Sequence, residues 1–110
     1  MKDMIISGGE NIYPAEVENA LMHHPDVIDA AAVGVPDDKW GETVKGFVVL
    51  KKDSKVRESD IIAATKNLIA SYKCPSSINF ISAMPRNPSG KILRRELRAP
   101  FWEDGQRNVS

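Results

Sequence analysis

The spacing of hydrophobic positions along the chain predicts two strands and two helices. The runs from Val27 to Val35 and from Thr43 to Leu50 are apolar and rich in small and branched residues, which is typical of buried strands. Residues 36–42 contain turn-forming residues and are expected to form the loop between them. Helices are expected to begin at Pro14 and near Glu58 or Ser59, where apolar residues recur at helical spacing. Their inner faces consist of Val17, Ala20, Leu21 and His24 in the first helix and Ile61, Ile62, Thr65, Leu68 and Ile69 in the second.

Shorter elements are expected at both ends of the chain. Residues 4–6 and 12–13 are two extended pieces around a glycine turn, which predicts a hairpin. Residues 78–81 form a candidate third strand. Residues 85–90 contain two prolines and a glycine and must form a loop. Ser89 is then expected to cap a last short helix, with Lys91 in its first turn and Ile92, Leu93 and Leu97 on its inner side.

These elements predict a fold of the α/β (α+β) class. We expect a small sheet of about three central strands and a short N-terminal hairpin, covered by two to three helices. Residues 4–100 are expected to form one compact domain, with a hinge or linker at residues 1–3 and a flexible tail at residues 101–110. The order of the strands in the sheet does not follow from the pattern.

The composition narrows the classes of protein to which the chain can belong. With 110 residues, 42% of them hydrophobic and 27% charged, the chain has the makeup of one globular domain. No apolar run approaches the roughly 20 residues of a transmembrane segment, and the first nine residues lack the features of a secretory signal. We therefore expect a cytoplasmic protein. A net charge of zero argues against a nucleic-acid-binding protein held by bulk electrostatics.

Neither a disulfide nor a metal site is expected. Cys74 is the only cysteine, so it cannot form an internal disulfide, and we interpret it as a reduced packing thiol. His23 and His24 are consecutive and cannot face one metal ion from a helix.

Charge is unevenly distributed along the chain. Residues 1–45 hold three lysines against nine acidic residues, a net charge of −6, and residues 46–110 hold twelve basic against six acidic residues, a net charge of +6. The densest basic stretch contains Lys91, Arg94, Arg95 and Arg98, opposed by Glu96. It is either a surface for an anionic partner or a solvated helix face.

Four segments carry a resemblance to a known family. Pro85-Arg86-Asn87-Pro88-Ser89-Gly90-Lys91 is similar to the signature P-R-[ST]-x-[ST]-G-K, from which Asn87 departs. The other segments are residues 2–18, Asp37-Asp38-Lys39-Trp40-Gly41-Glu42, and Tyr72-Lys73-Cys74-Pro75. In this order and at these separations they resemble the C-terminal domain of an acyl-CoA synthetase of the adenylate-forming superfamily, and they extend over nearly the whole chain.

The resemblance implies an ATP-dependent acid:CoA ligase that works in two steps. A carboxylate attacks the α-phosphate of ATP and releases pyrophosphate, and the thiol of CoA then displaces AMP to give the thioester. Lys91 stands at the position of the family's adenylation lysine, whose compact ammonium can bridge carboxylate and phosphate oxygens. Gly90 before it allows the backbone to approach a ligand. The alternative for Lys91 is an exposed lysine in a turn.

Further residues gain roles through the same resemblance. Lys2, with Asp3, falls at the hinge about which the small domain rotates between the two steps. The residues implied to contact CoA or its pantetheine arm are Ser7, Gly8, Gly9, Trp40, Tyr72 and Lys73. The alternatives are a frayed terminus for Lys2, a plain hairpin turn for the glycines and core packing for Trp40.

The partners implied by the resemblance are the N-terminal adenylation domain of the same enzyme, a fatty or aryl carboxylic acid, ATP and CoA. Mg²⁺ would accompany ATP in the parent enzyme, and none of these cofactors is expected on this domain alone. Two alternatives stay open. The acceptor could be the phosphopantetheine of a carrier protein, as in an acyl-AMP ligase or a peptide-synthetase adenylation domain, or the chain could be a free-standing binding module that performs no chemistry.

Overall fold

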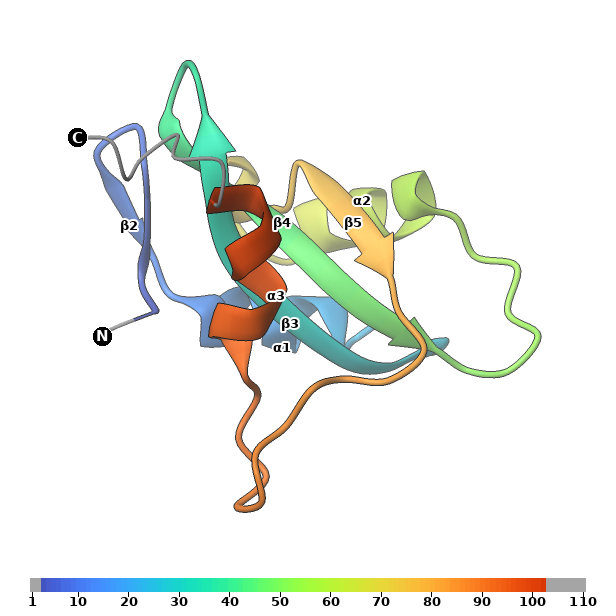
Figure 1. Cartoon of the computed structure of the whole chain (residues 1–110). Coiled ribbons are helices and arrows are strands. Elements are labelled where there is room, and N and C mark those ends of the chain that lie inside the picture. Colours follow the sequence, from blue (N-terminus) through green and yellow to red (C-terminus); the bar gives the residue numbers. More distant parts are fainter. Residues whose placement is uncertain (1–2, 103–110) are drawn as a thin grey trace.

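A computed structural model describes residues 3–102, which form two small sheets and three helices (Figure 1). The elements are, in chain order, β1 (Ile5–Ser7), β2 (Glu10–Ile12), α1 (Pro14–Leu21), β3 (Val27–Asp37), β4 (Gly41–Leu50), α2 (Glu58–Lys66), a 3₁₀ turn η1 (Ser71–Lys73), β5 (Ser77–Phe80) and α3 (Arg94–Trp102). This arrangement confirms the expected α+β class and the N-terminal hairpin. The hinge residue Lys2 and the tail residues 103–110 lie outside the described residues.

The main sheet has the order β3-β4-β5. β3 and β4 form an antiparallel hairpin from Val27↔Leu50 to Asp37↔Gly41, and β5 is parallel to β4. The loop expected at residues 36–42 is therefore shorter than predicted, because Pro36 and Asp37 continue β3 and Gly41 and Glu42 begin β4. Pro36 is tolerated there because β3 is an edge strand, where one missing N–H breaks few ladder bonds.

Helices cover both faces of this sheet. Figure 1 shows α3 in front of β3 and β4, with α1 and α2 behind them. Alternation along the strands supplies both cores. Ala30 and Ala32 pack in the cluster that contains Leu21 of α1 and Ile61 of α2, whereas the intervening Ala31 packs on the opposite side. That opposite cluster consists of Ala31, Val33, Val35 and Phe47, with Ile81, Met84, Ile92, Leu97 and Phe101 against it.

The C-terminal end of α3 is held by two aromatic residues that the sequence analysis assigned to the tail. The ring of Phe101 packs edge-on against Phe47, with centroids 6.3 Å apart. Trp102 Nε1 donates a hydrogen bond of 2.9 Å to the carbonyl oxygen of Gly34 in β3. Residues 101 and 102 therefore belong to the folded domain and to α3 rather than to a flexible tail, because both side chains find partners on the sheet.

Side chains form hydrogen bonds with backbone groups on both edges of the main sheet. On β3, Ala32 N donates to Glu18 Oε2 at 2.9 Å, and the Gly34 carbonyl oxygen accepts the bond from Trp102. On β5, Ile78 N donates to Glu58 Oε2 at 2.7 Å. These contacts satisfy donors and an acceptor that an edge strand would otherwise leave unpaired.

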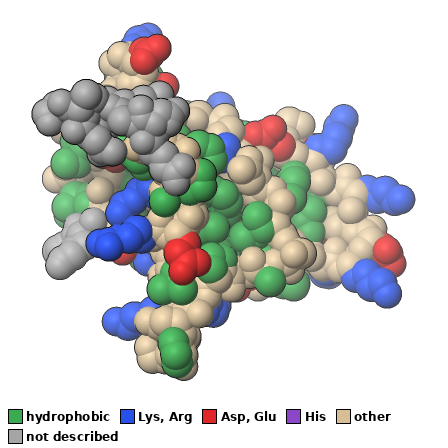
Figure 2. All heavy atoms as spheres, viewed as in Figure 1, with side chains coloured by type: hydrophobic (Ala, Val, Ile, Leu, Met, Phe, Trp, Pro, Cys, Tyr) green, Lys and Arg blue, Asp and Glu red, His purple; other side chains and the backbone are tan. Residues whose placement is uncertain are grey.

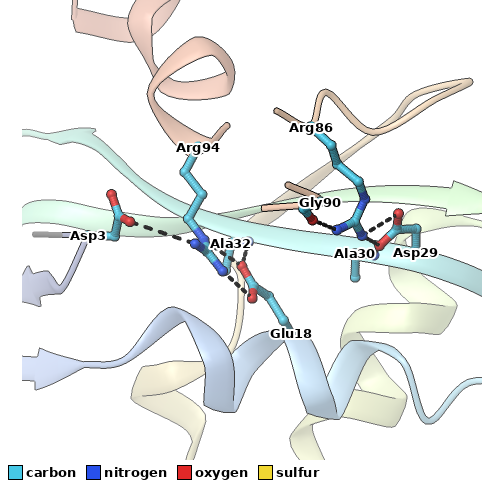
Figure 3. Close-up of polar contacts among 8 residues, drawn as sticks. All are labelled: Asp3, Glu18, Asp29, Ala30, Ala32, Arg86, Gly90 and Arg94. Atoms are coloured by element: carbon cyan, nitrogen blue, oxygen red, sulfur yellow. Dashed lines mark hydrogen bonds and ion pairs between the residues drawn. The ribbon is translucent and has the colours of Figure 1, made fainter. Parts of the chain in front are cut away.

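One carboxylate joins three elements of the fold. Glu18 of α1 is 8% exposed, and its oxygens accept hydrogen bonds from Ala32 N and from Arg94 of α3, with Nε at 2.8 Å and Nη2 at 2.6 Å (Figure 3). Arg94 Nη1 also lies 3.7 Å from Asp3 Oδ2. The bonds to Glu18 are the main reason that the pKa of Arg94 is raised above its usual value. Glu18 thus fixes α3 against α1 and β3.

We predict that Glu18→Gln lowers the free energy of unfolding by about 2–3 kcal/mol, because it removes the nearer and hydrogen-bonded counter-charge of a mostly buried guanidinium. Urea unfolding of the chain measures the change. Glu10→Gln is the matched control, since Glu10 is exposed, and its effect should stay within about 0.5 kcal/mol. Equal stability of the two variants would contradict a structural role for the Glu18 charge.

Candidate functional site

Residues 85–93 form a loop that projects from the sheet at the end opposite the β3–β4 turn (Figure 1). The loop is closed by backbone bonds between its two sides: Asn87 N donates to Lys91 O and Leu93 N to Pro85 O, each at 2.9 Å. Gly90 N donates to Asn87 O at 2.9 Å, which closes a turn with Pro88 at its second position. Gly90 has φ +91°, a value that favours glycine.

The side chain of Asn87 organises the tip of this loop. Its Oδ1 accepts hydrogen bonds from Ser89 N at 3.0 Å, Ser89 Oγ at 2.9 Å and Lys91 N at 2.9 Å. A serine or threonine hydroxyl can make the same kind of short contact to the amide two residues on. Asn87 therefore keeps a hydrogen-bond acceptor at the position where the signature has serine or threonine.

Lys91 does not lie in a helix, so the prediction that Ser89 caps α3 and that Lys91 occupies its first turn is wrong. α3 begins at Arg94. The positive φ of Gly90 and the pairing of Arg86 with Ile92 keep the chain in a hairpin-like path before the helix. Lys91 is exposed, and within residues 3–102 its ammonium forms no hydrogen bond or ion pair. The loop therefore presents a charged group from a constrained backbone.

Arg86 connects the loop to the sheet. Its Nη1 donates to the carbonyl oxygen of Gly90 at 2.6 Å, and its Nη2 lies 2.8 Å from both carboxylate oxygens of Asp29 in β3 (Figure 3). Asp29 Oδ1 in turn accepts a hydrogen bond from Ala30 N at 3.0 Å. Sequence reasoning named neither Arg86 nor Asp29 as a site residue, because 57 positions separate them.

A cavity of about 490 Å³ brings together four of the six residues assigned to CoA. Ser7, Gly8, Trp40 and Tyr72 line it, whereas Gly9 and Lys73 do not. The remaining lining residues are Glu10, Thr43, Lys66, Ser71, Cys74, Pro75 and Ser76. The cavity lies between the β1–β2 turn, the β3–β4 turn and η1, away from the loop that carries Lys91.

Trp40 and Gly8 are fitted to each other. Gly8 N donates to Trp40 O at 2.9 Å, and a Cβ on Gly8 would lie 2.7 Å from Trp40 Cε3. Gly8 also has φ +56°. The indole is 49% exposed, so it is not the core residue of the alternative interpretation. Absence of a side chain at position 8 therefore allows an exposed indole to lie against the glycine turn.

Two lysines near the cavity differ in their surroundings. Lys73 Nζ contacts Glu16, with Oε1 at 2.9 Å and Oε2 at 3.1 Å, and these bonds raise the pKa of Lys73. Lys66 lines the cavity and has no ion-pair partner among residues 3–102. Sequence reasoning missed Lys66, although its position at the end of α2, next to the predicted Tyr72 segment, was a usable signal.

Cys74 is a buried thiol in the cavity wall. Its side chain is 7% exposed, and its Sγ lies 3.5 Å from Ala70 O and 3.9 Å from Ile69 O. Burial raises the pKa of Cys74, with an opposing effect of the Lys66 charge. The thiol is therefore protonated near neutral pH and packs as the sequence analysis expected.

The charged stretch near Lys91 divides into two parts. Figure 2 shows Lys and Arg side chains gathered beside the first turns of α3, with hydrophobic side chains next to them on the same face. Arg94 of this stretch is taken up by Glu18, while Arg95 is exposed. One of the four basic residues thus serves the fold itself.

The described residues hold neither a metal-binding cluster nor a membrane-spanning helix. In residues 3–102 no group of three or more histidine, cysteine, aspartate or glutamate side chains is placed to hold a metal ion. No helix of the same residues has the length and hydrophobicity needed to cross a membrane.

Comparisons with known proteins match both the sequence and the fold. A family model for the AMP-binding enzyme C-terminal domain matches residues 16–91. A fatty acid:acyl-carrier-protein ligase from Streptomyces coeruleorubidus is 49% identical over 110 residues, which is 100% of this chain and 21% of the relative. A fatty acyl CoA synthetase from Mycobacterium tuberculosis has a TM-score of 0.84 at 46% identity, covering 91% of this chain and 20% of that one.

A further solved structure is o-succinylbenzoate CoA synthetase from Bacillus subtilis in complex with its acyl-adenylate intermediate. Its TM-score is 0.83 at 43% identity, over 87% of this chain and 19% of that one. The chain spans about a fifth of the length of these relatives. It belongs to the AMP-binding enzyme C-terminal domains of the adenylate-forming superfamily, which includes the acyl-CoA synthetases.

Proposed function

We propose that the chain is the C-terminal domain of an ATP-dependent fatty or aryl acid:CoA ligase and that Lys91 is its adenylation lysine. The observation that carries the proposal is an exposed ammonium on a loop whose backbone is fixed from within by Asn87 and Gly90. A cation presented in this way can enter the cleft of a neighbouring domain without first breaking an ion pair. The parent enzyme would use ATP with Mg²⁺, CoA and a carboxylic acid, and its N-terminal domain would be the partner of this one.

The chemistry proposed for Lys91 is electrostatic. When the carboxylate attacks the α-phosphate and pyrophosphate leaves, negative charge is redistributed over the phosphate oxygens. A positioned ammonium that contacts both the attacking carboxylate and these oxygens lowers the energy of the transition state. The fixed path of residues 87–91 reduces the reorganisation that this contact requires.

The second proposed site is the passage for CoA. Ser7, Gly8 and Trp40 line the 490 Å³ cavity together with Tyr72, and the two aromatic residues offer flat faces to an adenine ring or a pantetheine arm. Gly9 neighbours this wall without lining it. The aromatic side chains and the glycine turn in this lining support a role in the thioester step. The hinge role of Lys2 and Asp3 stays a prediction. The carboxylate of Asp3 forms an ion pair with Arg94, which lies far from it in the sequence.

Lys66 is a better candidate than Lys73 for a contact with the 3′-phosphate of CoA. Lys66 lines the cavity and has no ionic partner in the described part of the chain, whereas Lys73 would have to leave Glu16. Separation of a charged hydrogen-bonded pair opposes the new contact. We therefore add Lys66 to the proposed CoA residues and treat Lys73 as a residue that braces η1 against α1.

The acceptor of the acyl group has a specific alternative. The relative from Streptomyces coeruleorubidus that matches the whole chain is a ligase for an acyl-carrier protein. A phosphopantetheine arm would need the same narrow passage past Gly8. Supplying the complete enzyme with free CoA and with a carrier protein, in parallel, identifies the acceptor by the thiol that becomes acylated. A module without chemistry would acylate neither.

We predict that Lys91→Ala in the complete enzyme slows adenylation roughly a hundredfold or more, about 3–4 kcal/mol of transition-state stabilisation. Pyrophosphate release measures this step, and thioester formation from supplied acyl adenylate should be nearly unaffected. Lys55→Ala removes an exposed lysine outside the proposed sites and serves as the control. Adenylation at a normal rate in Lys91→Ala would rule out the proposed role.

We predict that Trp40→Ala raises the KM for CoA about tenfold in the thioester step, since loss of aromatic stacking on a base costs about 1–3 kcal/mol. Adenylation should not change. Phe80→Ala is the matched control, because Phe80 is also a partly exposed aromatic residue, at 42%, and does not line the cavity. An unchanged KM in Trp40→Ala would remove Trp40 from the CoA site.

The two lysines near the cavity give a separate prediction. Lys66→Gln should raise the KM for CoA about fivefold, ~1 kcal/mol, and more than Lys73→Gln does, because Lys66 alone of the two lines the cavity. The effect should shrink at high ionic strength. Dephospho-CoA tests the cause, since removal of the 3′-phosphate should abolish the difference. A larger effect of Lys73→Gln would reverse the assignment.

A further inference from the structure

We propose that Arg86 and Asp29 are positioning residues for Lys91, acting through the carbonyl group of Gly90. This inference rests on the proposed adenylation role of Lys91. It assigns a function to an ion pair that lies outside both proposed sites. Neither residue is proposed to touch ATP or the carboxylic acid.

The contacts form a short chain from the sheet to the catalytic lysine. Asp29 is fixed in β3 and its carboxylate receives Arg86 Nη2 at 2.8 Å on each oxygen. Arg86 Nη1 is 2.6 Å from the oxygen of Gly90, the residue immediately before Lys91 (Figure 3). The carbonyl group of Gly90 belongs to the peptide unit whose nitrogen is Lys91 N, and that nitrogen donates to Asn87 Oδ1. The peptide plane before Lys91 is therefore held on both of its polar atoms.

Among residues 3–102, this pair is also the side-chain polar connection between the loop and the sheet. The other hydrogen bonds of residues 85–93 join parts of the loop to each other, apart from the bond from Glu96 N of α3 to Leu93 O. The side chain of Ile92 adds an apolar contact with the core below α3. Without Arg86 or Asp29 the tip would keep its turn and lose its orientation relative to β3. A shift of about 1 Å in a catalytic group can cost roughly a hundredfold in rate.

The chemistry of the guanidinium fits this task. Its planar fork directs one nitrogen to a carboxylate and another to a carbonyl oxygen at the same time, which a lysine ammonium on a flexible stem does not reproduce with the same geometry. Both side chains are partly exposed, Arg86 at 40% and Asp29 at 26%. An exposed ion pair contributes little to folding stability, so its substitution should leave the fold intact.

The location of the pair separates its effect from that of the CoA passage. The loop and the β3–β4 turn lie at opposite ends of the sheet (Figure 1). A substitution at Arg86 or Asp29 should therefore slow the step that uses Lys91 and spare the step that uses the cavity. General damage to the domain would slow both steps.

The test uses the complete enzyme with Arg86→Gln, Asp29→Asn and the double variant. Each single variant should slow pyrophosphate release at least tenfold through kcat, leave thioester formation from supplied acyl adenylate within about twofold, and leave the melting temperature nearly unchanged. The double variant should be no slower than the slower single variant, because both residues support one contact. Arg86→Lys should recover little of the rate. Arg57→Gln removes an exposed arginine of a different ion pair and is the matched control.

Combination with Lys91→Ala distinguishes the inference from the function on which it rests. If Arg86 acts through Lys91, adding Arg86→Gln to Lys91→Ala should cause no further loss of adenylation. A further loss, normal adenylation in Arg86→Gln and Asp29→Asn, or equal slowing of both steps would overturn the positioning role while leaving Lys91 in place. Normal adenylation in Lys91→Ala alone would overturn both proposals.

Discussion

The hydrogen bonds to the Glu18 carboxylate are the interactions on which the placement of α3, and of the loop at residues 85–93 that leads into it, depends. It joins α1, the edge of β3 and Arg94, the first residue of α3. Arg94 follows the loop at residues 85–93, and Arg86 ties the start of the same loop to Asp29. Guanidinium groups therefore anchor the loop on both sides, each to an acidic residue from the first half of the chain. Lys91 lies between the two anchors.

Ion pairs between the acidic first half and the basic second half of the chain explain much of the uneven charge distribution. The sequence analysis left two meanings for the basic stretch, an anionic partner or a solvated helix face. In residues 3–102, long-range ion pairs join acidic side chains of the first half to basic side chains of the second, as in Glu18–Arg94, Asp29–Arg86 and Glu16–Lys73. Part of the basic charge therefore forms ion pairs within the domain, which is neither of these two alternatives. Arg95 is exposed, so it can contact an anionic partner or remain solvated.

Local pattern was enough to predict the strands and the starts of the first two helices, because hydrophobic periodicity and turn residues act over a few positions. It wrongly placed Lys91 in the first turn of a helix, and it included Leu68 in α2, although Leu68 lies beyond the end of that helix and is exposed. It was insufficient where distant residues decide. The start of α3 depends on Asn87 and Gly90 holding the chain in a turn, and its end depends on Phe101 and Trp102 meeting the sheet. Prolines and charges alone do not indicate which carboxylate a given arginine will find.

The structure brings four of the six residues that the resemblance assigns to CoA, namely Ser7, Gly8, Trp40 and Tyr72, to the wall of one cavity. Their contact with CoA stays a prediction. The motifs named these residues because each lies in a segment with its own signature. They did not separate Lys73, which is paired with Glu16, from Lys66, which faces the cavity. That distinction depends on a contact across 57 positions, which no local pattern contains.

The occupied edges of the main sheet have a consequence for solubility. Edge strands with open backbone groups can recruit strands from other molecules and lead to aggregation. Here Glu18 and Trp102 satisfy groups on β3 and Glu58 satisfies one on β5. Glu58 is exposed, so its carboxylate would also repel a second copy approaching in the same orientation. A small domain whose sheet edges are covered in this way can expose both flanks to water without polymerising.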